Sequence, residues 1–272
     1  MLRPYAPTTM HVHFLDPYRP HSSPIHRLDG RVKFVLTLAF ILTAALLPAG
    51  AWAAYSALFG LILLAEFLSA LGVGYVLKRS ALAFPFVLAA LPVIFTIKGP
   101  IVAQLPLGLS ISSVGLERFA SIALKSWLSV QAAVVMAAST PFPDLLVAMR
   151  AVRLPRLLVA LFGLMWRYLF VFADEVLRLT RARAARSGQS DLPGAKTGGS
   201  VAWRARVTGG MAGNLFLRAF ERSDRIYMAM LARGYDGEVR TLPLPAIRRV
   251  HWLVLVVGLA LLLLLLGLGF LY

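Results

Sequence analysis

The sequence is poor in the features on which soluble proteins and many enzymes depend. It contains no cysteine, which excludes disulfide bonds and thiolate metal sites. Only 15% of its 272 residues are charged, and 59% are hydrophobic. A soluble globular domain is about 25% charged and about 45–50% apolar. The shortage of charge, joined to the excess of apolar residues, predicts an integral membrane protein.

Acidic residues are the scarcer charge type, with 12 Asp and Glu against 28 Lys and Arg and a net charge of +16. In membrane proteins basic residues collect on the cytoplasmic side of the spans, so their placement is more informative than their number. About thirty polar and Pro/His-rich residues precede the first apolar run, whereas a secretory signal has that run close to its start. We therefore expect no cleaved signal peptide.

Long apolar runs occur at 32–48, 51–71, 80–97, 118–139 and 251–271. Each has about 17–22 residues, enough for a helix rising about 1.5 Å per residue to cross ~30 Å of hydrocarbon. A sixth run, 157–173, has a similar length but is interrupted by Arg167. Hydropathy alone leaves open whether this run also crosses the membrane.

Charge placement favours five spans. With the N-terminus inside, 25 of the 28 Lys and Arg fall in cytoplasmic parts of the chain, whereas a crossing by 157–173 would move the 14 basic residues of 174–250 outside. We therefore predict an all-α integral membrane protein with about five transmembrane helices and a large cytoplasmic segment that contains two long helices. The predicted parts are a cytoplasmic N-terminal arm (1–31), a four-helix transmembrane region (32–139), the cytoplasmic segment (140–250) and a C-terminal transmembrane helix (251–272).

Polar groups inside the predicted spans are few. Glu66 is the main charge there, and we expect it to pair with a neighbouring helix or to reach the interface, with an ion path as the alternative. A self-sufficient secondary transporter carries several buried polar groups and broken helices at the midplane, and the sequence does not show them.

Reactive clusters are also scarce. His11 and His13 have the alternating spacing of a metal site, but no carboxylate or cysteine stands at a useful distance in the sequence. We therefore favour an irregular arm over a metal site. We predict no catalytic residue, no metal site and no cofactor bound by this chain.

Helices are predicted through the segment that follows the fourth span. Asp29 is positioned to cap the first span, and Asp144 to cap a short helix over about 144–152. A long helix is predicted from about 156 to 187, apolar in its first half and rich in arginine in its second. There Asp174 and Arg178 stand one turn apart and are expected to pair.

A second long helix is predicted over about 201–233, with Glu221 and Arg225 one turn apart. Between the two long helices, 190–199 forms a linker. It resembles a phosphate-binding loop only superficially, because Ala195 precedes Lys196 where the G-x-x-x-x-G-K-[ST] pattern needs glycine, and no strand leads into it. No nucleotide site is predicted there.

The two long helices have matching ends. Each finishes in an alanine and an arginine just before a glycine stop, in the sequences Ala185-Arg186-Ser187 (followed by Gly188) and Ala232-Arg233-Gly234. A cation in the last turn is favoured by the helix dipole by about 0.3–1 kcal/mol. An arginine at one helix end is ordinary, but two matching ends in one segment indicate a pair of protein-binding tips, whose guanidinium groups are arranged for bidentate carboxylate recognition.

In their order along the chain these motifs resemble the transmembrane T component of energy-coupling factor (ECF) transporters, specifically the CbiQ branch associated with cobalt uptake. The resemblance covers nearly the whole chain. Each piece is weak alone and the ordered set is specific. The pieces are Ser23-Pro24-Ile25-His26-Arg27-Leu28-Asp29-Gly30-Arg31-Val32-Lys33, Pro141-Phe142-Pro143-Asp144-Leu145-Leu146, Leu154-Pro155-Arg156, Arg167-Tyr168, Ala185-Arg186-Ser187 and the run 221–237.

The resemblance implies a non-catalytic scaffold in a prokaryotic cell membrane, with its N-terminus and its coupling segment (140–250) in the cytoplasm. Two ABC-type ATPase subunits would bind Ala185, Arg186 and Ser187 at one tip, and Ala232, Arg233 and Gly234 at the other, with Glu221, Arg225 and Tyr235 in support. The same helices would hold a separate substrate-binding membrane subunit of the metal type. Lipid is the remaining partner, and no nucleic acid is expected.

Other functions are less favoured by the residues. A nickel or vitamin importer would use the same coupling role. A membrane enzyme acting on phosphate-bearing lipid needs clustered carboxylates for a metal ion, whereas the acids of the cytoplasmic segment alternate with arginines. A binder of anionic lipid or nucleic acid would suit the basic charge, but the aromatic residues are not interleaved as a stacking platform.

Overall fold

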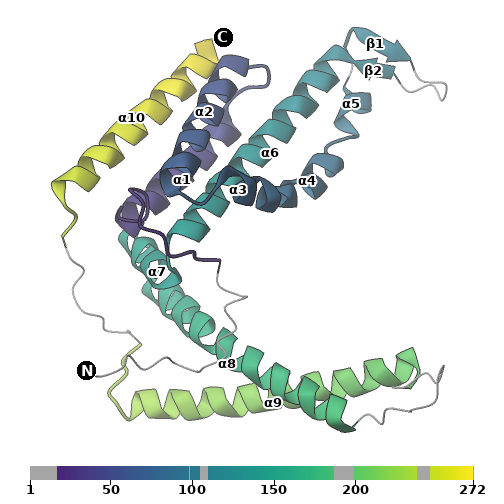
Figure 1. The fold of residues 1–272 in the computed structure, drawn as a ribbon, viewed down its shortest axis with the longest axis vertical. Coiled ribbons are helices and arrows are strands. Elements are labelled where there is room, and N and C mark those ends of the chain that lie inside the picture. Colours follow the sequence, from purple (N-terminus) through teal and green to yellow (C-terminus); the bar gives the residue numbers. More distant parts are fainter. Residues whose placement is uncertain (1–16, 98, 105–109, 187–198, 238–245, 272) are drawn as a thin grey trace. The chain divides into compact units, whose positions relative to one another are not determined.

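The computed structural model describes residues 17–97, 99–104, 110–186, 199–237 and 246–271. The chain divides into two compact units (Figure 1). One, here called the bundle unit, draws its described residues from 17–153 and 246–271. The other, here called the helix-pair unit, draws them from 154–237.

Four of the predicted spans are single helices of the bundle unit. They are α1 (Gly30–Leu46), α2 (Trp52–Ser69), α6 (Ser113–Ser139) and α10 (Arg249–Leu271). The predicted cap of α1 is confirmed, since the Asp29 carboxylate accepts the backbone N–H of Arg31 at 2.9 Å. Ser112 caps α6 in the same way by accepting the N–H of Gly115 at 2.9 Å. Local cap chemistry therefore sets where these helices begin.

The prediction of one continuous helix over 80–97 is wrong. This stretch is divided among α3 (Val73–Ser80), a 3₁₀ turn (Ala81–Ala83), α4 (Phe84–Ala89) and α5 (Val93–Thr96). Pro85 lies in the first turn of α4 and Pro92 directly precedes α5. Because proline lacks an N–H and clashes with the preceding turn, each marks a new helix start rather than a continuation.

A short antiparallel hairpin follows α5. Strands β1 (Ile101–Gln104) and β2 (Ser110–Ser112) pair with Ile101 opposite Ser112 and Gln104 opposite Ser110, with an irregularity between Ile101 and Ala103. This hairpin is a small addition to a fold that is otherwise built from helices in the part of the chain described, so the predicted all-α class is confirmed.

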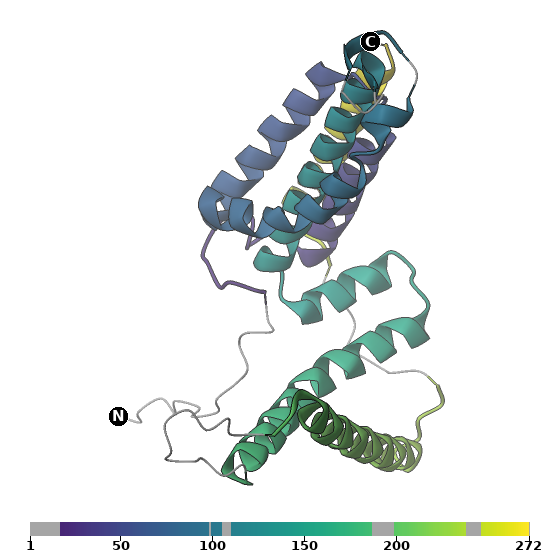
Figure 2. The ribbon, with the colours of Figure 1, turned by 90° about the vertical axis from the view of Figure 1, so that its right-hand side faces the viewer.

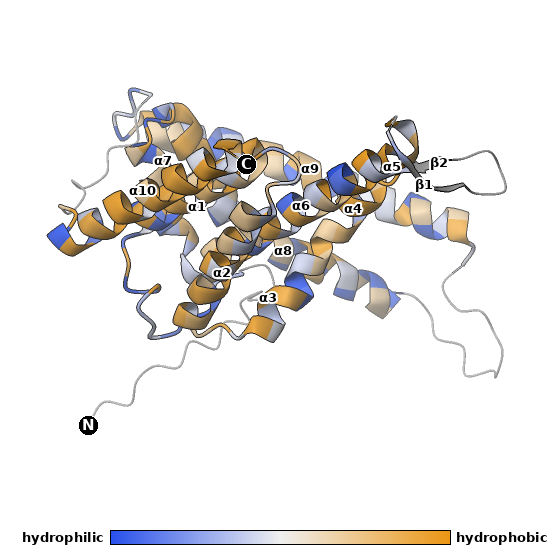
Figure 3. Cartoon of the chain, turned by 90° about the horizontal axis from the view of Figure 1, so that it is seen from above, coloured by the Kyte–Doolittle hydropathy of each residue, from blue (hydrophilic) through white to orange (hydrophobic). Residues whose placement is uncertain are grey.

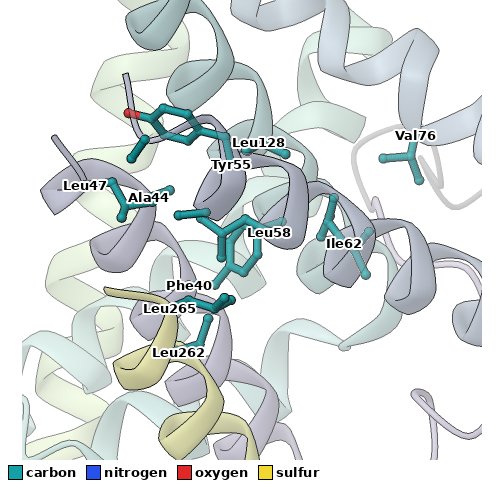
Figure 4. Packing of buried hydrophobic residues seen from close by; sticks show 14 of the residues in the cluster. Phe40, Ala44, Leu47, Tyr55, Leu58, Ile62, Val76, Leu128, Leu262 and Leu265 are labelled. Atoms are coloured by element: carbon teal, nitrogen blue, oxygen red, sulfur yellow. The ribbon is translucent and has the colours of Figure 1, made fainter. Parts of the chain in front are cut away.

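Helix α6 lies at the centre of the bundle unit and packs against α1, α2, α3, α4 and α5, while α10 packs against α1 and α2. One hydrophobic cluster joins these helices (Figure 4). Leu58 of α2 and Leu128 of α6 are fully buried within it, and Leu262 and Leu265 bring in α10. Each buried side chain of this kind makes many van der Waals contacts that are individually weak and collectively large, so the close packing of this cluster holds the helices together.

The outside of the bundle unit exposes many large apolar side chains. Large side chains such as Phe67, Leu263 and Leu271 are exposed, and Figure 3 shows apolar residues along the length of α10. A soluble protein rarely exposes apolar surface on this scale. The surface therefore faces lipid, and the chain is a membrane protein as predicted.

Five helical segments in the described residues are long and apolar enough to cross a membrane, and the predicted number is confirmed. They are Trp52–Ser69, Val73–Thr96, Ser113–Ser139, Arg156–Arg186 and Arg249–Leu271. The set differs from the predicted one in two respects. It leaves out α1, which has 17 residues, and it includes the helix that contains 157–173. The exclusion of 157–173 from the membrane rests on charge placement and stays a prediction.

Helix α7 (Phe142–Ala151) belongs to the bundle unit and packs against α1. Its cap position is Pro141, so Asp144 lies in its first turn and is not the cap that the sequence suggested. At the contact with α1, a Cβ atom on Gly30 would lie 3.1 Å from Cβ of Asp144. The glycine therefore permits α7 to approach closely.

The helix-pair unit consists of α8 (Arg156–Arg186) and α9 (Val201–Leu231), each of 31 residues and therefore ~46 Å long. Neither helix has a buried residue. They cross one another in Figures 1 and 2 and pack at the crossing. Two long helices that bury nothing of their own have surfaces left for partners or lipid.

Candidate functional site

The first predicted tip is the end of α8. Arg186 is the last residue of the helix, and Ala185 and Arg186 are both exposed. The described part of α8 thus reaches the predicted tip, and the predicted stop just beyond it stays a prediction. Ser187 and the expected stop at Gly188 lie outside the described residues.

The second predicted tip follows α9 in a glycine-closed turn. Gly234 has φ 77°, and its N–H donates to the carbonyl of Leu231 at 2.9 Å, while the N–H of Tyr235 donates to the carbonyl of Met230 at 3.0 Å. This pair of bonds is the Schellman motif, and it confirms Gly234 as the stop. Helix α9 ends at Leu231, and Arg233 lies exposed in the closing turn between Ala232 and Gly234, which are exposed too.

A single carboxylate joins the two long helices. Glu175 of α8 accepts from Arg218 Nη1 of α9 at 2.6 Å, and its second oxygen is 3.1 Å from Arg178 Nη2. The Glu175 side chain is only 15% exposed, which makes it the most enclosed charge at the crossing. The predicted pairing of Arg178 with Asp174 is wrong, because Arg178 pairs with Glu175 instead. Hydrogen bonds between ionised groups are shorter and stronger than neutral ones.

Further contacts on either side of this ion pair give the direction of the crossing. Arg183 Nη1 donates to Thr208 Oγ1 at 3.0 Å, and the Arg222 guanidinium lies 5.9 Å from the centre of the Phe172 ring. Residues later in α8 therefore meet residues earlier in α9, which means that the helices cross antiparallel.

An antiparallel crossing separates the two tips. From Glu175 to Arg186 the helix extends ~16 Å, and from Arg218 to Arg233 ~22 Å, at about 1.5 Å per residue. Because the two ends point away from one another, Arg186 and Arg233 are roughly 25–40 Å apart. One small pocket cannot hold both tips.

The supporting residues chosen from sequence do not form the predicted pair. Glu221 and Arg225 are exposed, and no ion pair within 4.0 Å joins them among the described residues. Tyr235 follows the glycine turn and is half-buried. The role assigned to these three residues at the second tip stays a prediction.

The face of α9 that points away from α8 is apolar and unoccupied by the described residues. Phe216 (69% exposed), Phe220 and Tyr227 lie on one side of the helix, opposite to Arg218. Toward the start of the same side, Cβ atoms added to Gly209 and Gly213 would meet nothing within 4 Å. Such a row of glycines and aromatic rings permits close approach of another helix.

The bundle unit has its own polar contacts, and the sequence did not reveal them. The Lys33 ammonium group of α1 donates to the carbonyl of Ser139 at the end of α6, at 2.7 Å. In return, Lys125 of α6 donates to the carbonyls of Ala45, at 3.1 Å, and Leu47 at the end of α1. The last carbonyls of a helix have no partner within it and carry negative partial charge, so each lysine caps the other helix.

The N-terminal arm is fastened to the same end of α6. The N–H of Arg19 donates to the carbonyl of Ala138 at 2.9 Å, and His26 Nε2 lies 2.9 Å from the carbonyl of Arg19. Since a carbonyl only accepts, Nε2 carries the proton and Nδ1 accepts from the hydroxyl of Ser23 at 2.7 Å. Burial lowers the pKa of His26, which favours this neutral form. The 23–33 motif thus has a packing role.

Three buried polar side chains of the bundle unit have no hydrogen-bond partner among the described residues, namely Glu66 of α2, Gln131 of α6 and Thr140. Glu66 is 1% exposed, so the expectation that it pairs with a neighbouring helix or reaches the interface is wrong. The described residues contain no group of three His, Asp or Glu that could hold a metal ion. His11 and His13 lie outside the described residues.

The sequence matches the family of cobalt transport proteins, CbiQ, over residues 21–243. It is 28% identical to the cobalt transport protein CbiQ of Rhodobacter capsulatus over 167 residues, which cover 60% of this chain and 65% of that protein. It is 27% identical to the energy-coupling factor transporter transmembrane protein EcfT of Listeria innocua over 233 residues, 82% of this chain and 84% of that one.

A third curated relative is an uncharacterised protein of Methanocaldococcus jannaschii, 29% identical over 113 residues. That match covers 42% of this chain and 39% of the relative. The chain therefore spans less than two thirds of the length of this relative and of the Rhodobacter protein, whereas it spans most of the Listeria protein.

Proposed function

The chain belongs to the CbiQ family of cobalt transport proteins, and from that premise we propose that it is the transmembrane coupling subunit of an ECF-type ABC importer. It carries no ATPase or substrate site of its own. Two ABC-type ATPase subunits bind the tips at Arg186 and Arg233, and a separate membrane subunit binds the substrate. The chain transmits the motion of the ATPase subunits to the substrate-binding subunit.

The observation that carries this proposal is the pair of exposed arginine tips at the ends of two crossed helices. Arg186 and Arg233 stand roughly 25–40 Å apart on opposite sides of the crossing. A spacing of this size suits two separate binding grooves, one on each of two ATPase subunits. A single arginine tip would support only a single contact.

The crossing supports a lever-like mechanism. When the ATPases close on ATP, the distance between their grooves changes and the tips move with them. Because Glu175 joins α8 to Arg218 of α9, the helices turn about this contact instead of sliding apart. The energy comes from the ATPases, and the helices convert the change in tip spacing into a tilt at the membrane.

The outer face of α9 supports contact with the substrate-binding subunit. Phe216 and Phe220 are exposed there beside the open surface at Gly209 and Gly213. Exposed apolar rows of this kind mark protein or membrane contacts. A tilt of α9 would therefore move the substrate-binding subunit that contacts it.

Cobalt is the proposed substrate of the assembly. It rests on the family and on the Rhodobacter relative, which is named a cobalt transport protein. The Listeria relative is named for energy coupling without a substrate. A nickel or vitamin importer with the same coupling role is the alternative, because the substrate is chosen by another subunit.

Charge reversal at both tips tests the proposal. In the assembled transporter, Arg186→Glu with Arg233→Glu is expected to abolish ATPase co-purification and metal uptake while leaving the chain in the membrane. Arg153→Glu with Arg248→Glu, at exposed arginines outside α8 and α9, removes the same charge and is the matched control. ATPase association and uptake that survive in the tip variant, at the level of the control, would exclude the proposed function.

A further inference from the structure

The surroundings of the two tips differ in charge although their sequences match. Five arginines gather where the end of α8 meets the beginning of α9, and they are here called the basic collar. Its members are Arg181, Arg183, Arg186, Arg204 and Arg206. The bond from Arg183 to Thr208 ties the two helices together at this place. Neither 176–186 nor 199–220 contains an Asp or Glu, so the collar has no acidic residue of its own among these residues.

The second tip is balanced in charge. Over 221–237 three arginines are matched by three acids, Glu221, Asp224 and Asp236. Its exposed surface is instead apolar, with Tyr227 54% and Met228 66% exposed and Leu231 close behind them on the last turn. These three residues are here called the apolar end. Tyrosine and methionine are enriched in protein interfaces because they bury a large area.

Like charges repel one another, and no ion pair within the described residues offsets the charges of Arg181, Arg186, Arg204 and Arg206, so an acidic partner surface would relieve the repulsion. Each guanidinium of the collar can form two parallel hydrogen bonds with a carboxylate. The amino end of α9 lies in the collar and adds positive potential from its unpaired N–H groups. An acidic protein surface fits this potential.

The placement of the arginines favours a protein over a lipid surface. Arg181 and Arg186 are five positions apart on α8, which puts them about 140° apart around the helix axis. Helices that lie on anionic membranes carry their basic residues on one face, with an apolar face opposite. A collar that surrounds the helix end suits a groove that encloses it.

We propose that the two tips dock by different chemistry, the first by ion pairs between the basic collar and an acidic groove of its ATPase, the second by burial of the apolar end in an apolar groove. This inference rests on the proposed function. It assigns binding roles to Arg181, Arg204 and Arg206 at one tip and to Tyr227 and Met228 at the other. The first contact weakens strongly as salt rises, whereas the second, in which Arg233 is accompanied by apolar side chains, weakens little.

The absence of cysteine makes a local test practicable. Single cysteines are introduced at Ala182 or Ala229, exposed positions near the two tips, and labelled with a fluorophore that reports the approach of a quencher-labelled ATPase. The full complex is held in nanodiscs of neutral lipid and titrated from low to high salt. We expect ATPase contact at position 182 to weaken about tenfold across the titration and contact at 229 to stay within about twofold.

Variants separate the two contacts. Arg204→Gln with Arg206→Gln should remove most of the salt dependence at position 182 and leave position 229 unchanged. Tyr227→Ser with Met228→Ser should weaken contact at 229 at every salt concentration and leave 182 unchanged. Equal salt responses at the two positions in the unaltered complex would overturn the inference.

The test also distinguishes the failure of this inference from that of the proposed function. Complete absence of ATPase contact at both positions, even at low salt, would contradict the coupling role itself. Salt-dependent quenching at position 182 by phosphatidylglycerol vesicles that carry the quencher, with no ATPase present, would assign the collar to lipid and overturn the docking proposal. ATPase contact with equal salt responses at both tips would leave the coupling role standing and remove only the difference in chemistry.

Discussion

The bundle unit and the helix-pair unit differ in whether their side chains are buried within the unit or exposed on its surface. In the bundle unit the helix ends are capped from within, by Lys33 on α6 and Lys125 on α1, around a buried apolar cluster. In the described residues of the helix-pair unit none is buried, and the polar contacts between α8 and α9 are made by long side chains. The bundle unit is therefore stabilised by its own packing, whereas the surface of the helix pair is available to partners.

The difference predicts where a substitution acts. Changes to the bundle unit should alter stability first and transport only as a consequence. Changes to the helix pair should alter transport while the chain stays folded, because little folding free energy depends on exposed contacts.

Loss of the Lys33 cap should have the largest effect on stability. Lys33→Met leaves the buried carbonyl of Ser139 at the end of α6 without its 2.7 Å partner. A buried group left without its hydrogen bond costs about 1–3 kcal/mol. We expect the thermal midpoint of the solubilised chain to fall by roughly 4–8 °C. Lys78→Met, at an exposed lysine of α3, is the control and should change it little. An unchanged midpoint in Lys33→Met would show that the cap does not stabilise the bundle.

Reversal of the charge at Glu175 should lower transport and change stability little, the opposite of the Lys33 substitution. Glu175→Arg breaks the contact with Arg218 and places a third positive charge at the crossing. We expect uptake per ATP hydrolysed to fall severalfold while the thermal midpoint changes little, since an ion pair of this kind contributes about 1 kcal/mol or less to stability. The measurement is metal uptake and ATPase activity in the same vesicles.

Two variants make the Glu175 experiment specific. Asp174→Arg is the matched control, because Asp174 is the exposed neighbour that the structure leaves out of the crossing. Glu175→Arg with Arg218→Glu exchanges the charges and should restore much of the coupling ratio. Failure of the exchange to recover any coupling, with both variants folded, would contradict a role for this ion pair as the pivot.

The sequence was sufficient where the signal is local. The cap at Asp29 and the glycine-closed end at Gly234 are determined by adjacent residues, and the structure confirms both. It was insufficient where residues far apart in the chain meet. Lys33 and Ser139 are separated by 106 positions, and Glu175 and Arg218 by 43. No periodicity in one helix tells which side chain of another helix it will face.

The predicted helix over 80–97 is wrong for a different reason, the prolines at 85 and 92. The run 80–97 has the length and hydropathy of a span, and those properties predict one continuous helix. In the structure the prolines prevail, because each removes a backbone hydrogen bond that a continuous helix would need. Hydropathy indicates which residues are stable in lipid. Whether they form one continuous helix depends on an unbroken series of backbone N–H donors, which proline interrupts.

A pair of glycine substitutions should give the smallest and most local contrast, within the helix pair itself. Gly234 has φ 77°, a conformation that costs an alanine about 1–2 kcal/mol, whereas Gly210 lies inside α9 with nothing within 4 Å of an added Cβ atom. Gly234→Ala should loosen the closing turn and misdirect Arg233, which would lower uptake modestly. Gly210→Ala should stabilise α9 by about 0.5–1 kcal/mol and leave uptake unchanged.

Amide hydrogen exchange can measure this contrast along α9. Gly234→Ala should speed exchange of the N–H groups at position 234 and at Tyr235, which donate to the carbonyls of Leu231 and Met230, and nowhere in the bundle unit. Gly210→Ala should slow exchange in the middle of the helix. If uptake falls when exchange in the closing turn rises, and does not change when exchange within α9 slows, then the orientation of Arg233 matters more for uptake than the stability of α9. If the two substitutions change uptake equally, the second tip acts only through the stability of α9.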